Sequence, residues 1–470
     1  MNSVYAQAAS GKSVAIIGGG VAGATVALYL AKQGVEVTLF EKNVTLVSGP
    51  PICHLHAGGN LYRDLSHQHC IDLLEQSIAF VRFFPQTINR RPTVIAVPKN
   101  DQGIPEALLP RLELLKNTYK TLVELDPNNE VLGQPEDYYR CVERSDLETL
   151  ALAESVSKPT SVDEWLIPFA KNTDLDKLKY PVYVVQEYGL SLFRVAATIE
   201  LAAELLPNLT VCTGVKVERV TSLEQGVSIE YGDSSCGEFD YLINACGFRT
   251  GLIDDQLNYS RQRMVEFKAA YITHWQASSH EKWPEVIFHG QRGTPQGMAQ
   301  LTPYPDGYFQ LHGMTSDITL FEDGLVHSSE NSAQPCLPQY LMNKVDNGWS
   351  FDMQNQRSLS AISHLSQYVP SFINATPAGK PLFGAQQIPG TDPSLRTADV
   401  SFEGECYARL EIVKASSALQ AGKKIAAQWF NTTLRGDVFL TNDFELNIVE
   451  RKARELAVSR GYPESLAKAY

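Results

Sequence analysis

The sequence predicts an α/β fold in which a domain built on a parallel sheet is interleaved with an antiparallel β-sheet domain and a helical insert. Residues 14–42 read as strand, glycine-rich turn, helix and second strand, which is the opening unit of a doubly wound parallel sheet. Residues 263–320 instead alternate β-type runs with turns, a pattern typical of antiparallel strands. Because 470 residues are too many for one compact core, two domains are expected.

The glycine-rich turn predicts a dinucleotide-binding site. Gly18, Gly20 and Gly23 follow the apolar run 14–17 at G-x-G-x-x-G spacing. Gly18 permits the tight turn from strand to helix, Gly20 lets the backbone approach a pyrophosphate, and Gly23 lets the helix pack closely on the strand. The phosphates would bind the N–H groups at the start of the helix, at Val21 and Ala22, where the helix dipole favours negative charge.

An acidic residue ends the second strand of this unit. Glu41 is placed to accept hydrogen bonds from a ribose diol, and its charge would repel a 2′-phosphate, which argues against NADP. Lys42 and Ser48 follow it and are further expected contacts of the nucleotide. A lone G-x-G-x-x-G also occurs as an ordinary turn in α/β proteins, but here strand, helix, second strand and acid all stand at the required distances.

Composition limits the classes of binding partner and the cellular location that we expect for the protein. A net charge of -13 makes nucleic acid an unfavourable partner, although a local arginine cluster could still bind a small anion. No run of about eighteen apolar residues predicts a transmembrane segment. The eight cysteines form no CxxC pair and no zinc-site spacing, so no metal site is expected. We expect a cytoplasmic protein whose contact with a membrane, if it has one, is peripheral.

The domains are expected to be discontinuous along the chain. Helical apolar spacing marks residues 68–86 and 105–123, whereas 209–247 reads as a three-stranded layer that rejoins the nucleotide domain. We predict a nucleotide domain from 12–67, 181–260 and 370–440, a helical insert at 68–180, an antiparallel-sheet substrate domain at 261–369 and a C-terminal helical tail at 441–470.

A second motif carries a resemblance to a known family. Residues 240–247 read DYLINACG, and together with the glycine unit they resemble the FAD-dependent oxidoreductases of the D-amino-acid-oxidase-like class, relatives of glycine oxidase, dimethylglycine dehydrogenase and L-2-hydroxyglutarate dehydrogenase. The resemblance implies that the nucleotide domain is a Rossmann-like FAD-binding domain. It places Ala245 and Gly247 beside the nucleotide and aligns Val217 with the strand whose backbone meets the adenine ring.

The loop after the first unit extends the resemblance. Residues 54–63 read HLHAGGNLYR, and His56, Ala57 and Gly58 match a string that in relatives lies beside the flavin. In some of those relatives the matching histidine bonds covalently to the flavin 8α carbon, and in others it lies near the ring. Covalent attachment through His56 is therefore open, and so is a histidine satisfied by backbone in a polar loop.

The missing motifs narrow the reaction that the resemblance implies. The chain has no second glycine motif for NAD(P)H and no redox cysteine pair. It also lacks the sequence motifs of flavin monooxygenases of the hydroxybenzoate-hydroxylase type. The flavin would then take a hydride at N5 from a C–H beside a hydroxyl or amine of a small carboxylated substrate, and would pass electrons to O2, a quinone or a carrier protein. Two alternatives remain: a monooxygenase or modifying enzyme fed by a separate reductase, and a flavin-binding scaffold without activity.

Candidate catalytic residues follow from what this chemistry needs. An arginine should hold the carboxylate, a base should accept the substrate proton, and a dipole or cation should stabilise the flavin N1/O2 edge. The base candidates are His56 and His312, with His289 less favoured because strand histidines are usually structural. The carboxylate ligands and aromatic walls are sought among Arg63, Arg292, Arg409, the less favoured Arg249 and Arg263, Tyr304 and Tyr308.

The late helix departs from the family pattern. Its glycine-rich lead-in is replaced by residues 411–417, EIVKASS. Lys414, followed by Ala415, could supply by side chain the charge that relatives take from backbone, although a solvated lysine on an ordinary helix is an equal reading. The same departure is what keeps the scaffold alternative open.

Overall fold

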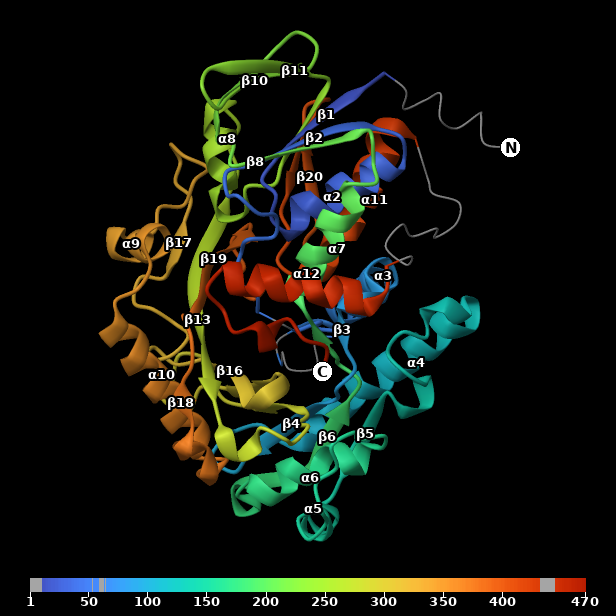
Figure 1. The fold of residues 1–470 in the computed structure, drawn as a ribbon, viewed down its shortest axis with the longest axis vertical. Helices are drawn as coiled ribbons and strands as arrows, with labels where there is room; N and C mark the ends of the chain where they lie inside the picture. Colours follow the sequence, from blue (N-terminus) through green and yellow to red (C-terminus); the bar gives the residue numbers. More distant parts are fainter. Residues whose placement is uncertain (1–10, 53, 59–62, 64, 432–443) are drawn as a thin grey trace.

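Two β-sheets organise the molecule. The computed structural model describes residues 11–52, 54–58, 63, 65–431 and 444–470. A six-stranded sheet lies at one end and a ten-stranded sheet runs through the remainder, as Figure 1 shows. The predicted fold class is confirmed, since a parallel nucleotide-binding sheet is interleaved in sequence with a largely antiparallel one.

The six-stranded sheet has the order β20-β21-β12-β1-β2-β8, in which only β20 runs antiparallel to its neighbour. Asp240 fixes the start of this sheet because its carboxylate accepts hydrogen bonds from the Ser13 backbone N–H at 2.8 Å and from Lys12 at 2.6 Å. The strands are β1 (Ser13–Ile17), β2 (Glu36–Glu41), β8 (Leu209–Thr213), β12 (Tyr241–Asn244), β20 (Val400–Glu403) and β21 (Tyr407–Leu410).

Alternate residues of β1 pack into two different hydrophobic cores, one on each face of the sheet. Val14 and Ile16 pack under helices α2, α7, α11 and α12, and Ala15 and Ile17 pack under a three-stranded antiparallel layer with α8. A three-stranded layer is thus present within the predicted range 209–247, but it spans 217–239, because β8 and β12 at the two ends of that range belong to the six-stranded sheet. These elements are α2 (Val21–Lys32), α7 (Leu192–Ala203), α11 (Ala418–Phe430), α12 (Leu446–Ser459), α8 (Thr250–Gln256), β9 (Val217–Ser222), β10 (Val227–Tyr231) and β11 (Ser235–Phe239).

The ten-stranded sheet has the path β17-β13-β16-β15-β14-β4-β6-β5, and β18 and β19 also pair with β13. β14 and β4 run parallel, and the other pairs run antiparallel. The strands are β4 (Thr93–Pro98), β5 (Tyr139–Val142), β6 (Leu178–Val185), β13 (Arg263–His274), β14 (Glu285–Phe288), β15 (Ala299–Pro303), β16 (Tyr308–Gly313), β17 (Leu325–His327), β18 (Thr376–Pro377) and β19 (Leu382–Pro389).

Two domain boundaries therefore differ from the prediction. Residues 68–180 are not a purely helical insert, because β4, β5 and the start of β6 belong to the large sheet. All six residues of β4 are buried, so the strand shows no alternation of apolar and polar residues that could have revealed it. The rest of β6 and all of β19 were assigned to the nucleotide domain, yet both pair within the large sheet.

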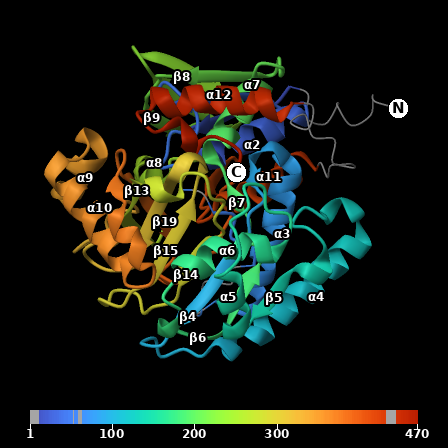
Figure 2. The same ribbon diagram turned by 60° about the horizontal axis from the view of Figure 1, so that its bottom comes forward.

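Helices cover the flanks of the large sheet. The expected helices at 68–86 and 105–123 are α3 and α4, and Figure 2 shows α4 on the opposite flank from α9 and α10. The Ser66 hydroxyl caps α3 by accepting from the His69 N–H. The bounds are α3 (His67–Phe83), α4 (Leu109–Leu125), α5 (Arg144–Leu150), α6 (Val162–Asn172), α9 (Gln339–Asn347) and α10 (Phe351–Ser366), and a short pair is formed by β3 (Ile88–Asn89) and β7 (Gly189–Leu190).

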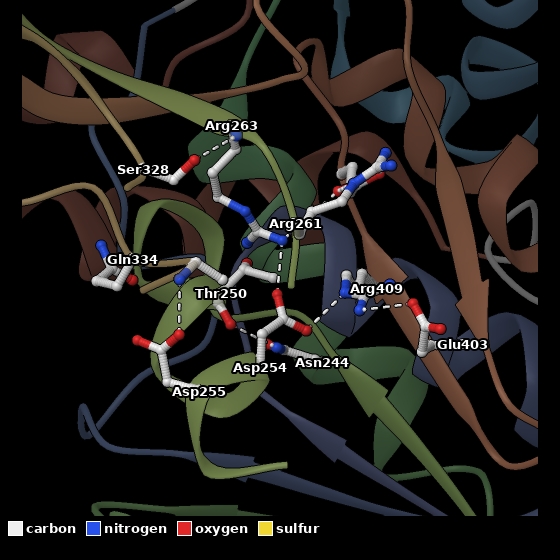
Figure 3. A network of polar contacts seen from close by, with 12 residues as sticks. Asn244, Thr250, Asp254, Asp255, Arg261, Arg263, Ser328, Gln334, Glu403 and Arg409 are labelled. Atoms are coloured by element: carbon white, nitrogen blue, oxygen red, sulfur yellow. Dashed lines mark hydrogen bonds and ion pairs between the residues drawn. The ribbon is translucent and has the colours of Figure 1, made fainter. Parts of the chain in front are cut away.

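A buried ion network joins the two sheets. Asp254 on α8 accepts from Arg263 of β13 at 2.6 Å and from Arg409 of β21 at 2.5 Å (Figure 3). Arg261 forms two hydrogen bonds to Glu411, at 2.9 and 2.7 Å, just beyond β21. The network fixes the start of β13, in the large sheet, against β21 of the six-stranded sheet.

Candidate active site

The glycine turn leaves open space only where a phosphate would need it. Gly18 has a φ of +105°, and a Cβ added there would lie 2.4 Å from the Ala245 carbonyl oxygen. A Cβ on Gly23 would lie 1.9 Å from the Gly18 carbonyl oxygen, so both positions are sterically closed. A Cβ on Gly20, the N-cap residue of α2, would meet no atom within 4 Å. This cradle at a helix N-terminus fits a pyrophosphate.

The end of β2 forms the second part of this site. Glu41 accepts a hydrogen bond from the Gly19 N–H at 2.7 Å and another from the Asn43 N–H at 2.8 Å. Its carboxylate oxygens keep further lone pairs with which to accept from a ribose diol. Ser48 accepts from the Asn43 side chain at 2.8 Å, and Lys42 lies exposed beside the same turn.

The second motif packs against the glycine turn. Ala245 contacts both Gly18 and Gly23, and Gly247 has a φ of +58° with open space around its Cα. Val215 donates its N–H to the Glu41 carbonyl at 2.9 Å, whereas Val217 stands two residues further on, at the start of β9. The backbone that meets the end of β2 is therefore that of Val215, and the assignment of Val217 to the adenine stays a prediction.

The histidine loop is fastened to the large domain. His56 has a φ of +58°, and Ala57 accepts a hydrogen bond from the Tyr138 hydroxyl at 2.8 Å. A Cβ on Gly58 would lie 2.7 Å from both Leu115 and that hydroxyl. These contacts set the path of the loop up to Gly58; residues 59–62, also part of the predicted string, lie outside the described residues.

Three distant segments meet at the loop. The Lys414 Nζ lies 3.1 Å from the His56 Nε2, at the N-cap of the 3-10 turn Ala415–Ser417 that leads into α11. Burial and the neighbouring Lys414 lower the pKa of His56, and burial and Arg396 lower the pKa of Lys414. Burial and Lys268 lower the pKa of His312, on β16, to about 4. Of the predicted residues, His56, His312 and Lys414 are thus brought together.

A second histidine stands behind His56 in a fully buried charge cluster. The His54 Nδ1 lies 2.9 Å from a Glu285 carboxylate oxygen, and its Nε2 lies 3.3 Å from Glu187. Glu285 also accepts from Arg91 at 2.5 Å, from Thr302 at 3.0 Å and from Gln300. Burial opposes the charge on His54, but the two carboxylates outweigh it and raise the pKa of His54 to about 9.

The large sheet supplies the opposite side of the site. Lys268 on β13 pairs with Glu266 at 2.6 Å and donates to Gln386 of β19 at 3.2 Å. Gln386 donates in turn to the Val413 carbonyl at 2.9 Å, which ties β19 to the residue before Lys414. Tyr304 is buried, and its hydroxyl donates to Gln310, whose side chain lies 3.4 Å from His312. Tyr304 therefore supports the residues behind His312 and does not form an open aromatic wall.

A cavity of about 820 Å³ lies along this region. Arg63 in its wall contacts His289 at 3.0 Å and pairs with Asp101 at 2.6 Å, and Arg292 pairs with Glu266. The residues that line it include Arg63, Arg292, Arg396, His289, Met298 and Met314.

Arg396, which no sequence motif marked, also lines this cavity. Its guanidinium donates to the Pro393 and Leu395 carbonyls at 2.9 and 2.8 Å. Its charge contributes to the lowered pKa of both His56 and Lys414.

Arg409 does not belong to this site. Its side chain is 1% exposed and is occupied by Asp254 and Glu403, as Figure 3 shows. The prediction that Arg409 binds the substrate carboxylate is wrong for this physical reason, and Arg263 is held in the same network. Arg249 pairs with Asp346 on α9, away from the residues that line the cavity.

Residues 13–141 match the family model described as "FAD dependent oxidoreductase" (DAO). The protein carries a DAO-family domain. It is an FAD-dependent oxidoreductase, and the open cradle at Gly20, the acid at Glu41 and the close packing of Ala245 fit its cofactor. No curated protein matches the sequence.

Solved structures resemble the fold over most of this chain. Glycine oxidase from Geobacillus kaustophilus aligns with a TM-score of 0.57 at 12% identity, covering 92% of this chain and 99% of that one. Iminodiacetate oxidase from Chelativorans sp. BNC1 gives 0.58 at 12%, covering 90% and 96%. L-Proline dehydrogenase from P. horikoshii gives 0.55 at 13%, covering 96% and 99%. At these identities the likeness concerns the fold.

Two further observations concern all of the residues that the structure describes. Among the described residues, no helix combines the length and apolar character that a membrane span requires. In the same part of the chain, no group of three or more His, Cys, Asp or Glu side chains is arranged to hold a metal ion.

Proposed function

We propose that the protein is a dehydrogenase or oxidase that takes a hydride from a C–H beside a hydroxyl or amine of a small carboxylated substrate. The observation that carries the proposal is the contact between the His56 Nε2 and the Lys414 Nζ at 3.1 Å, together with Arg396, which lines the cavity and lowers the pKa of both side chains. A cation for the carboxylate and a neutral base for the proton are what this oxidation requires.

Arg396 is the proposed carboxylate ligand. Guanidinium binds carboxylate through two parallel hydrogen bonds, and the two backbone carbonyls that accept from Arg396 orient its side chain. Arg63 and Arg292 line the same cavity, but Arg63 pairs with Asp101 and Arg292 shares Glu266 with Lys268. They suit orientation of a longer substrate better than primary capture of its carboxylate.

His56 and His312 are the proposed proton acceptors. Both have lowered pKa values and are therefore neutral near pH 7, so each can take the proton that leaves the substrate hydroxyl or amine. FAD, when bound, supplies the acceptor for the hydride and its two electrons. The electrons then pass to O2, a quinone or a carrier protein, which completes the cycle.

Anaerobic mixing with small 2-hydroxy acids and amino acids tests the proposal. A substrate should bleach the flavin absorption near about 450 nm, and the primary amide of the same compound should not, because it lacks the charge that Arg396 binds. Admitting O2 or a quinone afterwards identifies the acceptor. Bleaching only with NAD(P)H and a separate reductase would favour a monooxygenase, and no bleaching under any condition would favour a flavin-binding scaffold.

Covalent attachment of FAD through His56 is tested separately. The protein is precipitated in acid and the pellet is inspected for yellow colour. A yellow pellet that His56→Gln makes colourless would support the bond, and a colourless pellet from the unaltered protein would exclude it.

A further inference from the structure

The geometry around His54 fixes its charge. Both ring nitrogens face carboxylate oxygens, Glu285 at 2.9 Å and Glu187 at 3.3 Å. Carboxylates accept hydrogen bonds, so each nitrogen must donate, and an imidazole that donates from both nitrogens is a cation. With Arg91 on Glu285 at 2.5 Å, the cluster holds two positive and two negative groups, all buried. This neutral set is stable only while His54 keeps its second proton.

The cationic ring of His54 stands directly against His56. Their ring centroids are 4.1 Å apart at an interplanar angle of 67°. On its other side, the His56 Nε2 lies 3.1 Å from the Lys414 Nζ. His56 is thus enclosed between a fixed cation and an amine.

We propose that His54 is a positioning residue, whose imidazolium, clamped between Glu285 and Glu187, keeps His56 neutral and directs its Nε2 lone pair toward Lys414. A second positive charge about 4 Å from the first would be strongly disfavoured in a buried site. His56 therefore accepts a hydrogen bond or a proton and does not donate from both nitrogens.

The charged groups around His56 agree with this assignment. The side chains that face it are Lys414, His54, Arg396 and His312, and each of the four disfavours a proton on His56. Three of these side chains do not supply a permanent positive charge. His312 is neutral, the pKa of Lys414 is lowered, and Arg396 would bind the substrate carboxylate. His54 is the cation that persists when an anionic substrate has neutralised Arg396.

The consequence for catalysis rests on the proposed function. A substrate carboxylate on Arg396 would by itself raise the pKa of His56 and fill its lone pair with a proton. The imidazolium of His54 opposes that rise, so His56 stays neutral and its Nε2 stays an acceptor while the substrate carboxylate is bound.

Isosteric neutralisation of either carboxylate tests the proposal in the holoenzyme. In Glu285→Gln or Glu187→Gln, Arg91 and the remaining carboxylate balance each other, so His54 should lose its second proton. The two variants act from opposite sides of the ring, so one remains informative if the other folds poorly. Thr302→Val is the matched control, because it removes a neutral donor from Glu285 and leaves the charges of the cluster unchanged.

The readout is NMR titration of histidines labelled with carbon-13 at Cε1, with His56 assigned from the spectrum of His56→Asn. In both glutamine variants the midpoint of His56 should rise by about one to three pH units, and in Thr302→Val it should not move. The acid limb of the pH profile for flavin reduction should shift by the same amount. A His54 that keeps its proton in both variants, or a His56 midpoint that stays in place, overturns the inference.

The NMR result does not depend on the substrate. If the histidine midpoints shift while no carboxylated compound reduces the flavin, the positioning role stands and the proposed function fails. If a substrate is oxidised while His56 does not shift, the proposed function stands and the role of His54 fails.

Discussion

Two buried networks of arginine and carboxylate lie in this molecule, and they differ in one cation. At the junction of the two sheets, Asp254 is held by Arg263 and Arg409. Beneath the site, Glu285 is held by Arg91 and His54. Arginine stays protonated at every pH at which proteins fold, whereas histidine can release its proton. The first network is therefore suited to holding structure and the second to setting the charge of a neighbour.

The largest expected effect is at the junction. Asp254→Ala should destabilise the protein by about 3–5 kcal/mol, because it strands two buried guanidinium groups. Urea unfolding measures it. Glu403→Gln, on the 44% exposed partner of Arg409, should cost less than about 1 kcal/mol and serves as the control. Equal losses in the two variants would mean that the junction is not the buried support described above.

The pH dependence of stability should separate the two networks. The pKa of His54 is raised from 6.5 to about 9, so its contribution is complete below pH 6.5 and is lost as the pH rises through 9. The pKa of His312 is lowered to about 4, so its contribution is complete above pH 6.5 and is lost as the pH falls toward 4.

Together these two histidines predict a maximum of stability near neutral pH. The alkaline loss from His54 should be about 2–3 kcal/mol by unfolding between pH 6.5 and 9. Glu285→Gln should flatten that alkaline limb, and Glu403→Gln should leave it unchanged. An unaltered alkaline limb in Glu285→Gln would contradict the assignment of a cation to His54.

Loss of the proposed carboxylate ligand should act on turnover more than on folding. Arg396→Leu should lower kcat/KM by about 10–100-fold, because a charge-assisted hydrogen bond pair to the substrate is removed. Stopped-flow flavin reduction measures the step directly. Arg292→Leu, at an arginine already paired with Glu266, should have a smaller effect. A larger effect of Arg292→Leu than of Arg396→Leu would place the substrate carboxylate at Arg292 instead of Arg396.

The smallest effect is expected in the nucleotide cradle, which touches neither network. Gly20→Ala should weaken FAD binding about tenfold, since the new Cβ enters the open space where the pyrophosphate belongs. The stability of the apoprotein should hardly change. Gly18→Ala should instead destabilise the fold itself, because its φ is +105° and the Ala245 oxygen is 2.4 Å from the added atom. Flavin titration and thermal unfolding distinguish the two.

Local patterns predicted the parts of the molecule that are built locally. The turn at Gly18 to Gly23 and the acid at Glu41 belong to one strand-helix-strand unit, so their spacing alone predicted their arrangement. β4 was missed because every residue in it is buried, which leaves no alternation to read.

The charge partners could not be read in the same way. Arg91, Glu187 and Glu285 come from three segments that the fold alone brings together. Glu285, which directly precedes the apolar residues 286–288, was the one local indication in the sequence of a buried charge cluster. Arg409 was predicted to bind the substrate because no residue near it in the sequence indicated that it would pair with Asp254.

The order of strands in the six-stranded sheet also determines when this site can exist during synthesis. β1 pairs with β12, more than two hundred residues later, and β12 pairs with β21, which ends at Leu410. The nucleotide turn can therefore be closed by Ala245 once the chain has emerged as far as residue 245, but Lys414 can contact His56 only after residue 414 has also left the ribosome. Contacts of such long sequence separation form slowly. The cofactor cradle is thus assembled before the residues that would use it.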